Sequence, residues 1–347
     1  MKAGIYDPYL DTLGGGERYC LTLAEFLLNS GWEVDLLWEK KDLKEKIKEK
    51  FKINLEKANF VSLPKSLFIK AKFQRKYDLL FWLSDGSIPF MFGKKNILHF
   101  QAPFKNILKK TLKTSLKLKT INEIVCNSYF TKRIIDSCLG VNSKVIYPPV
   151  DVDSFKPLEK ENIILFVGRF SQLLQSKGHD ILVKAFKFLV DKRNLRKWKL
   201  ILAGGTEVGV GDYLKKIKKD SLGYPIKIIE NPNFNDLVNL YGKAKIFWSA
   251  SGYGVDEEKE PEKVEHFGIS VVEAMSAGAV PLTVKKGGFK EIIEEGKNGF
   301  FWQTPEELEE KTLRLIKIDL KKLQNEAIKR SKIFSKEKFY ENFQKII

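Results

Sequence analysis

Short apolar runs that alternate with helix-like segments are the feature that most constrains the fold of this chain. The first run covers residues 3–6 and precedes a helix-period segment at 17–29, which Gly31 ends. Further strand-like runs cover residues 34–38, 78–83, 96–100 and 123–127. Strands that alternate with helices are typical of a parallel sheet covered by helices on both faces. This part of the chain is therefore predicted to be a doubly wound α/β domain.

The alternation stops at Tyr147, Pro148 and Pro149 and then starts again. Two adjacent prolines continue neither a helix nor a central strand, so we place a domain boundary there. In the second series, strand-like runs cover residues 163–167, 199–203, 226–229, 246–248 and 279–284, and helix-like stretches cover 180–190 and 305–323. We predict two Rossmann-like domains, residues 1–149 and 150–330, with a ligand between them at the carboxyl ends of the strands.

The composition indicates a cellular compartment and limits the classes of binding partner. A hydrophobic content of 43% excludes a disordered chain. No apolar run approaches the roughly 20 residues of a transmembrane helix, and the first residues do not form a signal peptide. Three scattered cysteines suit a reducing compartment, so we expect a cytoplasmic protein. The net charge of +17 suits an anionic membrane, a phosphorylated substrate or nucleic acid, and the absence of any zinc-finger or RNP-like signature disfavours nucleic acid.

A glycine-rich turn lies between the first strand and the first helix, with Gly15 and Gly16 at its end. Glycine permits close backbone approach, and a helix N-terminus offers free N–H groups to an anion. The turn matches neither the G-x-G-x-x-G fingerprint nor a P-loop, so a purely structural turn is the alternative.

Two cations follow the first strand of the second domain. Arg169 comes directly after Val167 and Gly168, and Lys177 precedes the next helix. Two fixed cations at the mouth of a parallel sheet suit a diphosphate leaving group, whose developing charge they would stabilise. A solvated pair in a lysine-rich chain is the alternative.

The most specific segment runs from Glu265 to Gly278 and places Glu273 inside a helix. It places a carboxylate, which suits sugar or ribose hydroxyls, and several backbone N–H groups at a helix N-terminus. A surface glutamate and a helix-facing glutamate are the alternative. No Asp-x-Asp metal pair stands at a strand end, because Asp151 and Asp153 follow the two prolines in a linker turn. We therefore expect neither a metal nor a cofactor.

This segment resembles the E-x7-E motif of the family 4 retaining glycosyltransferases, which have the GT-B fold. Three further features resemble that family in the same order: the glycine-rich turn, the segment from Gly168 to Gly178, and the late glycines at 287–288 and 296–299. The resemblance runs through nearly the whole chain. It implies two Rossmann-like domains facing across a cleft, with a last helix at 331–347 packing back on the first domain.

The resemblance also implies roles for residues. Arg169 and Lys177 would hold the diphosphate of a GDP- or UDP-linked sugar, Glu273 the ribose, and Glu265 the transferred sugar. Gly15 and Gly16 would let the first domain close on the phosphates, with amides near Phe267, Gly268 and Ile269 also in contact. His99 matches the position of an active-site histidine, although a core or capping role is an equal alternative. The implied reaction retains the anomeric configuration by front-face displacement, without a metal.

Finer details resemble the lipid-linked-oligosaccharide α-mannosyltransferases, among them Glu265, His266, Phe267 and Gly268 in sequence. An acidic stretch at 254–260, expected to be mobile, departs from that pattern. Mannose is thus a candidate hexose, and a lipid-linked or cell-surface glycan a candidate acceptor. Residues 104–121 are predicted to form one amphipathic helix that lies on an anionic membrane or, alternatively, faces the core with its lysines in water. A sugar-nucleotide epimerase, a phosphorylase and a basic nucleic-acid-binding protein remain the competing interpretations.

Overall fold

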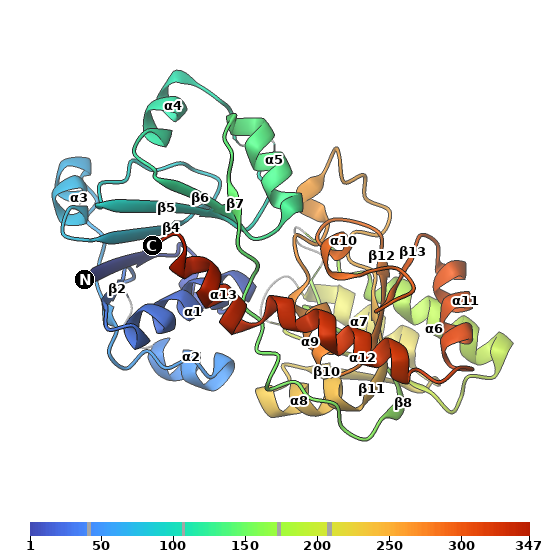
Figure 1. Ribbon diagram of the computed structural model, residues 1–347. Coiled ribbons are helices and arrows are strands. Elements are labelled where there is room, and N and C mark those ends of the chain that lie inside the picture. The colour runs from blue at the N-terminus through green and yellow to red at the C-terminus, as the bar shows by residue number, and fades with distance from the viewer. Residues whose placement is uncertain (40–42, 106–107, 172–174, 207–209) are drawn as a thin grey trace. The chain divides into compact units, whose positions relative to one another are not determined.

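The computed structural model divides the chain into two compact units. Unit 1 comprises Met1–Pro149 and Lys336–Ile347, and unit 2 comprises Val150–Ser335. The structure describes residues 1–347 except 40–42, 106–107, 172–174 and 207–209. Figure 1 shows the elements of each unit along the chain.

Unit 1 contains a seven-stranded, wholly parallel sheet in the order β3-β2-β1-β4-β5-β6-β7. The strands are β1 (Lys2–Tyr6), β2 (Glu33–Leu36), β3 (Asn59–Phe60), β4 (Leu79–Leu83), β5 (Lys95–Phe100), β6 (Glu123–Cys126) and β7 (Lys144–Val145). The helices are α1 (Gly15–Asn29), α2 (Leu43–Phe51), α3 (Leu67–Gln74), α4 (Leu112–Leu118), α5 (Tyr129–Leu139) and α13 (Lys336–Gln344), with a short 3-10 turn at Leu10–Thr12.

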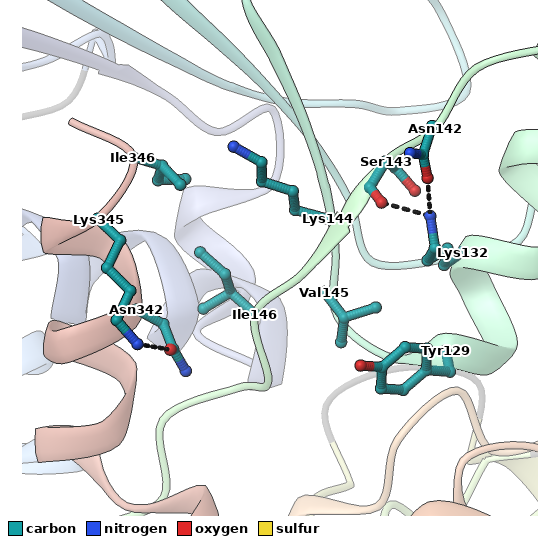
Figure 2. A pocket seen from close by; sticks show the side chains of 10 residues that line it. All are labelled: Tyr129, Lys132, Asn142, Ser143, Lys144, Val145, Ile146, Asn342, Lys345 and Ile346. Atoms are coloured by element: carbon teal, nitrogen blue, oxygen red, sulfur yellow. Dashed lines mark hydrogen bonds between the residues drawn. The ribbon is translucent and has the colours of Figure 1, made fainter.

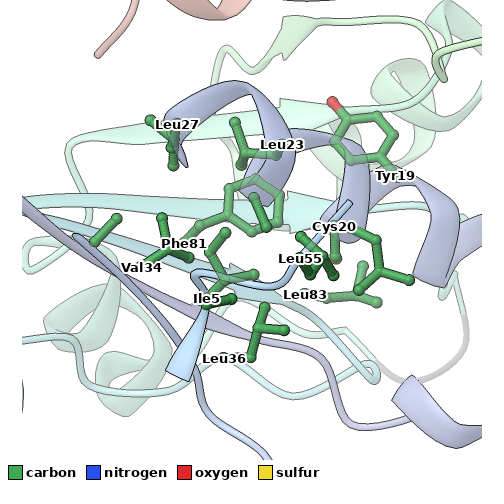
Figure 3. Close-up of a cluster of buried hydrophobic side chains, with 14 of the residues drawn as sticks. Ile5, Tyr19, Cys20, Leu23, Leu27, Val34, Leu36, Leu55, Phe81 and Leu83 are labelled. Atoms are coloured by element: carbon green, nitrogen blue, oxygen red, sulfur yellow. The ribbon is translucent and has the colours of Figure 1, made fainter. Parts of the chain in front are cut away.

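The two faces of this sheet carry separate hydrophobic clusters. The first joins the strands to α1, α2 and α13, and Figure 3 shows Leu23 and Leu27 of α1 over Phe81 of β4. The C-terminal helix is part of this cluster, because Phe339 and Phe343 pack edge-on against Tyr19 of α1. The second cluster lies on the opposite face and includes side chains of α3, α4 and α5. Hydrophobic side chains on both faces of a parallel sheet account for the continuous apolar runs of the sequence.

Unit 2 contains a six-stranded parallel sheet in the order β10-β9-β8-β11-β12-β13. The strands are β8 (Glu161–Val167), β9 (Lys199–Gly204), β10 (Ile226–Glu230), β11 (Ala244–Ser249), β12 (Val280–Val284) and β13 (Phe300–Trp302). The helices are α6 (His179–Arg193), α7 (Gly211–Ser221), α8 (Phe234–Lys243), α9 (Ile269–Ser276), α10 (Phe289–Ile292), α11 (Pro305–Leu315) and α12 (Lys321–Ser331), with 3-10 turns at Pro261–Lys263 and Lys332–Phe334. Both sheets have the doubly wound strand order, and the predicted fold class is confirmed.

Two predicted helices differ from the structure. The expected helix at 104–121 is reduced to α4, because Thr111 caps the helix by accepting a hydrogen bond from the Thr114 N–H. Ile107, assigned to its apolar side, lies outside the described residues. The expected helix at 305–323 is two helices, and Asp319 accepts from the Lys321 N–H where the second one begins. That second helix continues to Ser331, and residues 331–335 lie in unit 2, whereas the sequence placed a C-terminal segment from 331 onward.

Candidate functional site

The polar residues singled out in the second half of the chain gather at the carboxyl edge of the unit 2 sheet. Arg169 follows the end of β8 by two residues, and its side chain is exposed. Lys177 lies just before α6, the helix that crosses from β8 to β9. Ligands of doubly wound sheets bind at this edge, where the chain turns from strands into helices.

Lys177 and Glu265 are 88 positions apart in sequence and form an ion pair with a Nζ–Oε2 distance of 2.8 Å. Their side chains are only 14% and 21% exposed, so the pair is largely withdrawn from water. Burial alone would raise the pKa of Glu265, but the charge of Lys177, its hydrogen bond and, more weakly, Arg169 outweigh burial and lower that pKa. The site therefore holds an ionised carboxylate beside two cations.

The sequence did not reveal Gln175, which organises this pair. Its Oε1 accepts a hydrogen bond from Lys177 Nζ at 3.2 Å. Its Nε2 donates to the Val264 carbonyl at 2.6 Å and contacts the Glu262 carbonyl at 3.2 Å and His266 Nε2 at 3.1 Å. One amide side chain thus ties Lys177 to the segment that carries Glu265. No motif marks a glutamine for this role.

The late glycine turn closes on the backbone of Glu265. The Gly288 N–H donates to the Glu265 carbonyl at 2.8 Å. A Cβ built on Gly287, whose φ is +54°, would lie 2.1 Å from the same carbonyl oxygen. Only glycine fits there, because the turn packs directly against the Glu265 backbone.

The helix α9 follows Gly268, so the N–H groups of its first turn point out of its N-terminus. Ile269 is its first residue, while the Phe267 side chain is buried and packs edge-on against Phe334 with a centroid distance of 5.3 Å. Phe267 thus offers a ligand its backbone rather than its ring. An anion at this end of the helix would meet favourable dipoles.

Glu273 lies one turn further along α9 and is buried. Its Oε2 accepts a hydrogen bond of 3.0 Å from the Tyr241 hydroxyl, and Tyr241 is fully buried on α8. The hydroxyl fixes the carboxylate, leaving Glu273 oriented before any ligand arrives. Tyr241 is a second residue of the site that no sequence pattern indicated.

The acidic stretch at 254–260, expected to be mobile, is anchored in the structure. Glu257 accepts from the Gly287 N–H at 2.7 Å and pairs with Lys290 at 2.7 Å. Lys286 donates to the Val255 carbonyl. The stretch therefore belongs to the same framework as the late glycine turn.

Gly15, Gly16 and His99 belong to unit 1. Gly15 begins α1, and a Cβ on Gly16 would lie 2.0 Å from Gln101 Oε1, so the glycine makes room for a side chain that follows β5. His99, in β5, is fully buried and stacks on Tyr19 with ring centroids 3.9 Å apart. Its Nδ1 lies 3.2 Å from the Val125 carbonyl, and burial lowers its pKa to about 3. The imidazole is therefore neutral and sealed from water.

Asp7 is a further titratable residue at the carboxyl edge of unit 1. It directly follows β1, is buried, and accepts a hydrogen bond of 2.9 Å from the Tyr9 N–H. Burial, reinforced by the charge of Glu17, raises its pKa to about 7. This carboxyl can exchange a proton near neutral pH, which the sequence alone did not suggest.

A separate cavity of about 440 Å³ in unit 1 is lined by α5, β7 and the C-terminal helix. Figure 2 shows Lys132 bonded to Asn142 and Ser143, and Lys345 bonded to Asn342. None of the predicted site residues lines it. Within the described ranges, no group of three or more His, Cys, Asp or Glu side chains is placed to hold a metal ion. Among those same residues, no helix is both long and apolar enough to cross a bilayer.

Comparison with protein families identifies both halves of the chain. The family model described as glycosyl transferases group 1 matches residues 151–334. The model described as glycosyltransferase family 4 matches residues 13–154. Together they cover every site residue that the sequence analysis singled out.

A curated relative and two solved structures are similar to the chain. A GDP-Man:Man(3)GlcNAc(2)-PP-Dol alpha-1,2-mannosyltransferase of Xenopus laevis is 32% identical over 200 residues, which cover 51% of this chain and 37% of that protein. The matches to the first three curated relatives cover 37%, 33% and 64% of their lengths. A glycosyltransferase structure from Rickettsia africae aligns with a TM-score of 0.78 at 21% identity, covering 99% of this chain and 97% of that one. Anabaena HepE in complex with UDP and glucose aligns with a TM-score of 0.73 at 18% identity, covering 99% and 98%. These structural likenesses show a GT-B-like fold.

Proposed function

This chain belongs to the glycosyl transferases group 1 family, and we propose that it transfers a hexose from a nucleotide diphosphate sugar to an acceptor hydroxyl. The observation that carries the proposal is the Lys177–Glu265 pair, held by Gln175 beside Arg169 at the carboxyl edge of unit 2. The arrangement joins cations for a diphosphate to a carboxylate for a sugar.

Different residues of unit 2 would bind the diphosphate, the sugar and the ribose of the donor. Arg169 and Lys177 would hold the diphosphate, together with the N–H groups of Gly268 and Ile269 at the start of α9. Lys177 would then be shared between the phosphate and Glu265, which accepts hydrogen bonds from sugar hydroxyls. Glu273, oriented by Tyr241, would bind the ribose.

The reaction would proceed with retention and without a metal. As the bond to the leaving diphosphate breaks, negative charge grows on its oxygens, and Arg169 and Lys177 stabilise that charge without any reorganisation. The leaving phosphate would accept the proton of the incoming hydroxyl on the same face. In unit 1, Gly15 and Gly16 would approach the phosphates. His99, neutral and buried, would act by supporting the chain around Gln101.

The donor sugar and the acceptor follow from the relatives only as a proposal. The mannosyltransferase relative is named for GDP-mannose and a dolichol-linked acceptor. We propose GDP-mannose as the donor to test first, with UDP-glucose as the competitor, because HepE is described in complex with UDP-glucose. A lipid-linked glycan as acceptor would place the enzyme at the cytoplasmic surface of a membrane.

A thermal-shift panel of GDP-mannose, UDP-glucose, GDP and UDP, each with EDTA, tests the donor site. One nucleotide sugar should raise the melting temperature, and Arg169→Ala should weaken its affinity by about 10- to 100-fold, as loss of a charge-assisted hydrogen bond does. Arg169 is exposed, so this variant keeps the fold. Lys177→Met should have a similar effect on affinity.

Lys215→Met is the matched control, because Lys215 is a lysine of unit 2 that is 82% exposed on α7. Its affinity for the donor should equal that of the natural chain. If no nucleotide sugar shifts the melting temperature, or if Lys215→Met loses as much affinity as Lys177→Met, the donor site is misplaced.

A further inference from the structure

Two helices of unit 1, α3 and α4, contribute side chains to the hydrophobic cluster on one face of the sheet, and the C-terminal ends of both are hydrogen-bonded to one loop. Gln74, the last residue of α3, accepts through Oε1 from the Phe92 N–H at 3.1 Å. Thr120, just after α4, accepts through Oγ1 from the Met91 N–H at 3.1 Å. The segment that carries Met91 and Phe92 therefore links the ends of the two helices.

Both helices present apolar side chains to solvent. Phe68 and Leu112 are each 81% exposed, which is more than any other large hydrophobic side chain of the described residues. Leu67, Ile69 and Leu116 are exposed as well. Isolated exposed hydrophobic residues are ordinary, but a group of five on two helices that are tied to the same loop marks an interaction surface.

The packing of α4 explains why these side chains are not inside. No residue of α4 is buried, and the helix is held through Thr120 and the partly buried Leu118. On α3, the side chains that turn inward are Gln74 and Phe73, which leaves the first turn facing outward. A helix with no core-facing stripe needs another partner for its apolar side.

Lysines border the exposed apolar residues and give the surface its charge. Lys65 precedes α3 and Lys72 lies in its last turn, and three further lysines lie on and beside α4: Lys109, Lys113 and Lys119. All five are exposed, and none of them forms an ion pair within the part of the chain that the structure describes. We call these five lysines, with Leu67, Phe68, Ile69, Leu112 and Leu116, the α3–α4 surface.

The surrounding charge does not cancel these lysines. Residues 51–149 contain 18 Lys and Arg against 5 Asp and Glu. Four of those five carboxylates, Glu56, Asp78, Glu123 and Asp136, are already paired with lysines. The part of unit 1 that carries the α3–α4 surface is therefore strongly positive.

We infer that the α3–α4 surface binds an anionic lipid membrane, its apolar side chains entering the boundary between headgroups and acyl chains while its lysines contact the headgroups. Apolar residues bordered by unpaired lysines are the chemistry that such a membrane recognises. The inference rests on the proposed function in one respect: transfer to a lipid-linked acceptor would be the reason for membrane contact.

Co-sedimentation with phosphatidylcholine vesicles, with and without phosphatidylglycerol, tests the inference. The natural chain should bind the anionic vesicles and not the neutral ones. Phe68→Glu with Leu112→Glu should weaken that binding at least roughly tenfold, because two apolar anchors become charges of the same sign as the lipid. Lys109→Gln with Lys113→Gln should weaken it by roughly fivefold for each lysine removed.

Leu222→Glu is the matched control, since Leu222 is 74% exposed in unit 2. This variant should sediment like the natural chain. The inference is overturned if Leu222→Glu loses as much vesicle binding as Phe68→Glu with Leu112→Glu. It is also overturned if the natural chain does not bind anionic vesicles. A dimer that Phe68→Glu dissociates, seen by light scattering without vesicle binding, would assign the surface to a second copy of the chain and also overturn it. Salt-sensitive binding to duplex DNA in place of vesicles would assign it to nucleic acid, with the same consequence.

Donor binding by the vesicle variants separates this inference from the proposed function. Phe68→Glu with Leu112→Glu should keep the thermal shift with the nucleotide sugar, because the substitutions lie in unit 1 and the donor residues in unit 2. Vesicle binding without any donor shift would leave the membrane surface standing and refute the transferase. A donor shift without vesicle binding would do the reverse.

Discussion

The two units share one architecture but place their charge differently. Unit 2 has 32 Lys and Arg against 27 Asp and Glu, and a largely buried ion pair, Lys177 with Glu265, lies at the carboxyl edge of its sheet. Unit 1 has 29 Lys and Arg against 17 Asp and Glu, and many of its lysines border exposed apolar side chains on α3 and α4. The same fold thus carries an inward-facing polar site in one unit and an outward-facing basic surface in the other.

This difference agrees with the ligand that we propose for each unit. A nucleotide diphosphate is small and charged, and the withdrawal of Lys177 and Glu265 from water would strengthen their interaction with it. A membrane is large and flat, and it is met by long-range attraction and by side chains that lie on the surface. One fold can serve both purposes because its loops and helix starts, rather than its strands, carry the ligand contacts.

Removal of one buried phenylalanine ring should have the largest effect on stability, and it tests whether the two units unfold independently. Phe343→Ala should lower the free energy of unfolding of unit 1 by about 3–5 kcal/mol, because Phe343 is fully buried against Tyr19 and Phe81. Phe186→Ala in α6 should have the same cost in unit 2. Native-state hydrogen exchange read separately in the strands of each unit measures both.

If the units are independent, Phe343→Ala should leave exchange in β8, β9 and β11 unchanged. If exchange in those strands accelerates as much as in β1 and β4, both units unfold together. The two units would then differ in their surfaces but not in their stability.

Loss of the Gln175 side-chain contacts should show an intermediate effect. Gln175→Met keeps the length of the side chain but removes its hydrogen bonds to Lys177 and Val264, so affinity for the nucleotide sugar should fall about tenfold, or roughly 1.4 kcal/mol. Titration calorimetry provides the measurement. Gln303→Met, at an exposed position of the same unit, is the control and should bind normally. Unchanged affinity in Gln175→Met would show that Lys177 needs no support.

The buried histidines should show the smallest effect, and they compare the units directly. Burial lowers the pKa of His99 in unit 1 to about 3 and that of His179 in unit 2 to about 4. Below about pH 6.5 the unfolded chain takes up protons that the folded chain refuses, so stability is lost as the pH falls toward these values. Each histidine should lower the free energy of unfolding by about 1 kcal/mol when the pH falls from 7 to about 5.5.

His99→Phe and His179→Phe each remove the pH-dependent contribution of one histidine, the first in unit 1 and the second in unit 2. Urea unfolding at the two pH values measures the free energy of unfolding. As the pH falls, each variant should lose less of that free energy than the natural chain does. His99 faces Tyr19 and the Val125 carbonyl, whereas His179 faces Tyr213 with Asp180 and Lys177 nearby. A stability difference that does not change with pH would show that the folded and unfolded chains protonate the histidine equally, so that burial does not lower its pKa.

Much of the architecture and the outline of the site could be predicted from the sequence. The apolar runs at 3–6, 96–100 and 163–167 lie within β1, β5 and β8, because a strand buried on both faces leaves a continuous local signature. The helix at 104–121 was wrong, since a side-chain cap at Thr111 outweighs apolar spacing. Motif spacing drew attention to Arg169, Lys177, Glu265 and Glu273, but it gave no sign of Gln175 or Tyr241.

The sequence by itself determined two doubly wound parallel α/β units and the family to which the chain belongs, because both are recorded in local periodicity and in short, ordered motifs. Only the tertiary structure decided which residues meet. It joined Lys177 to Glu265 in an ion pair, buried His99 against Tyr19, and left Phe68 and Leu112 in solvent. Burial and pairing depend on segments far apart in sequence, and no local pattern carries that information.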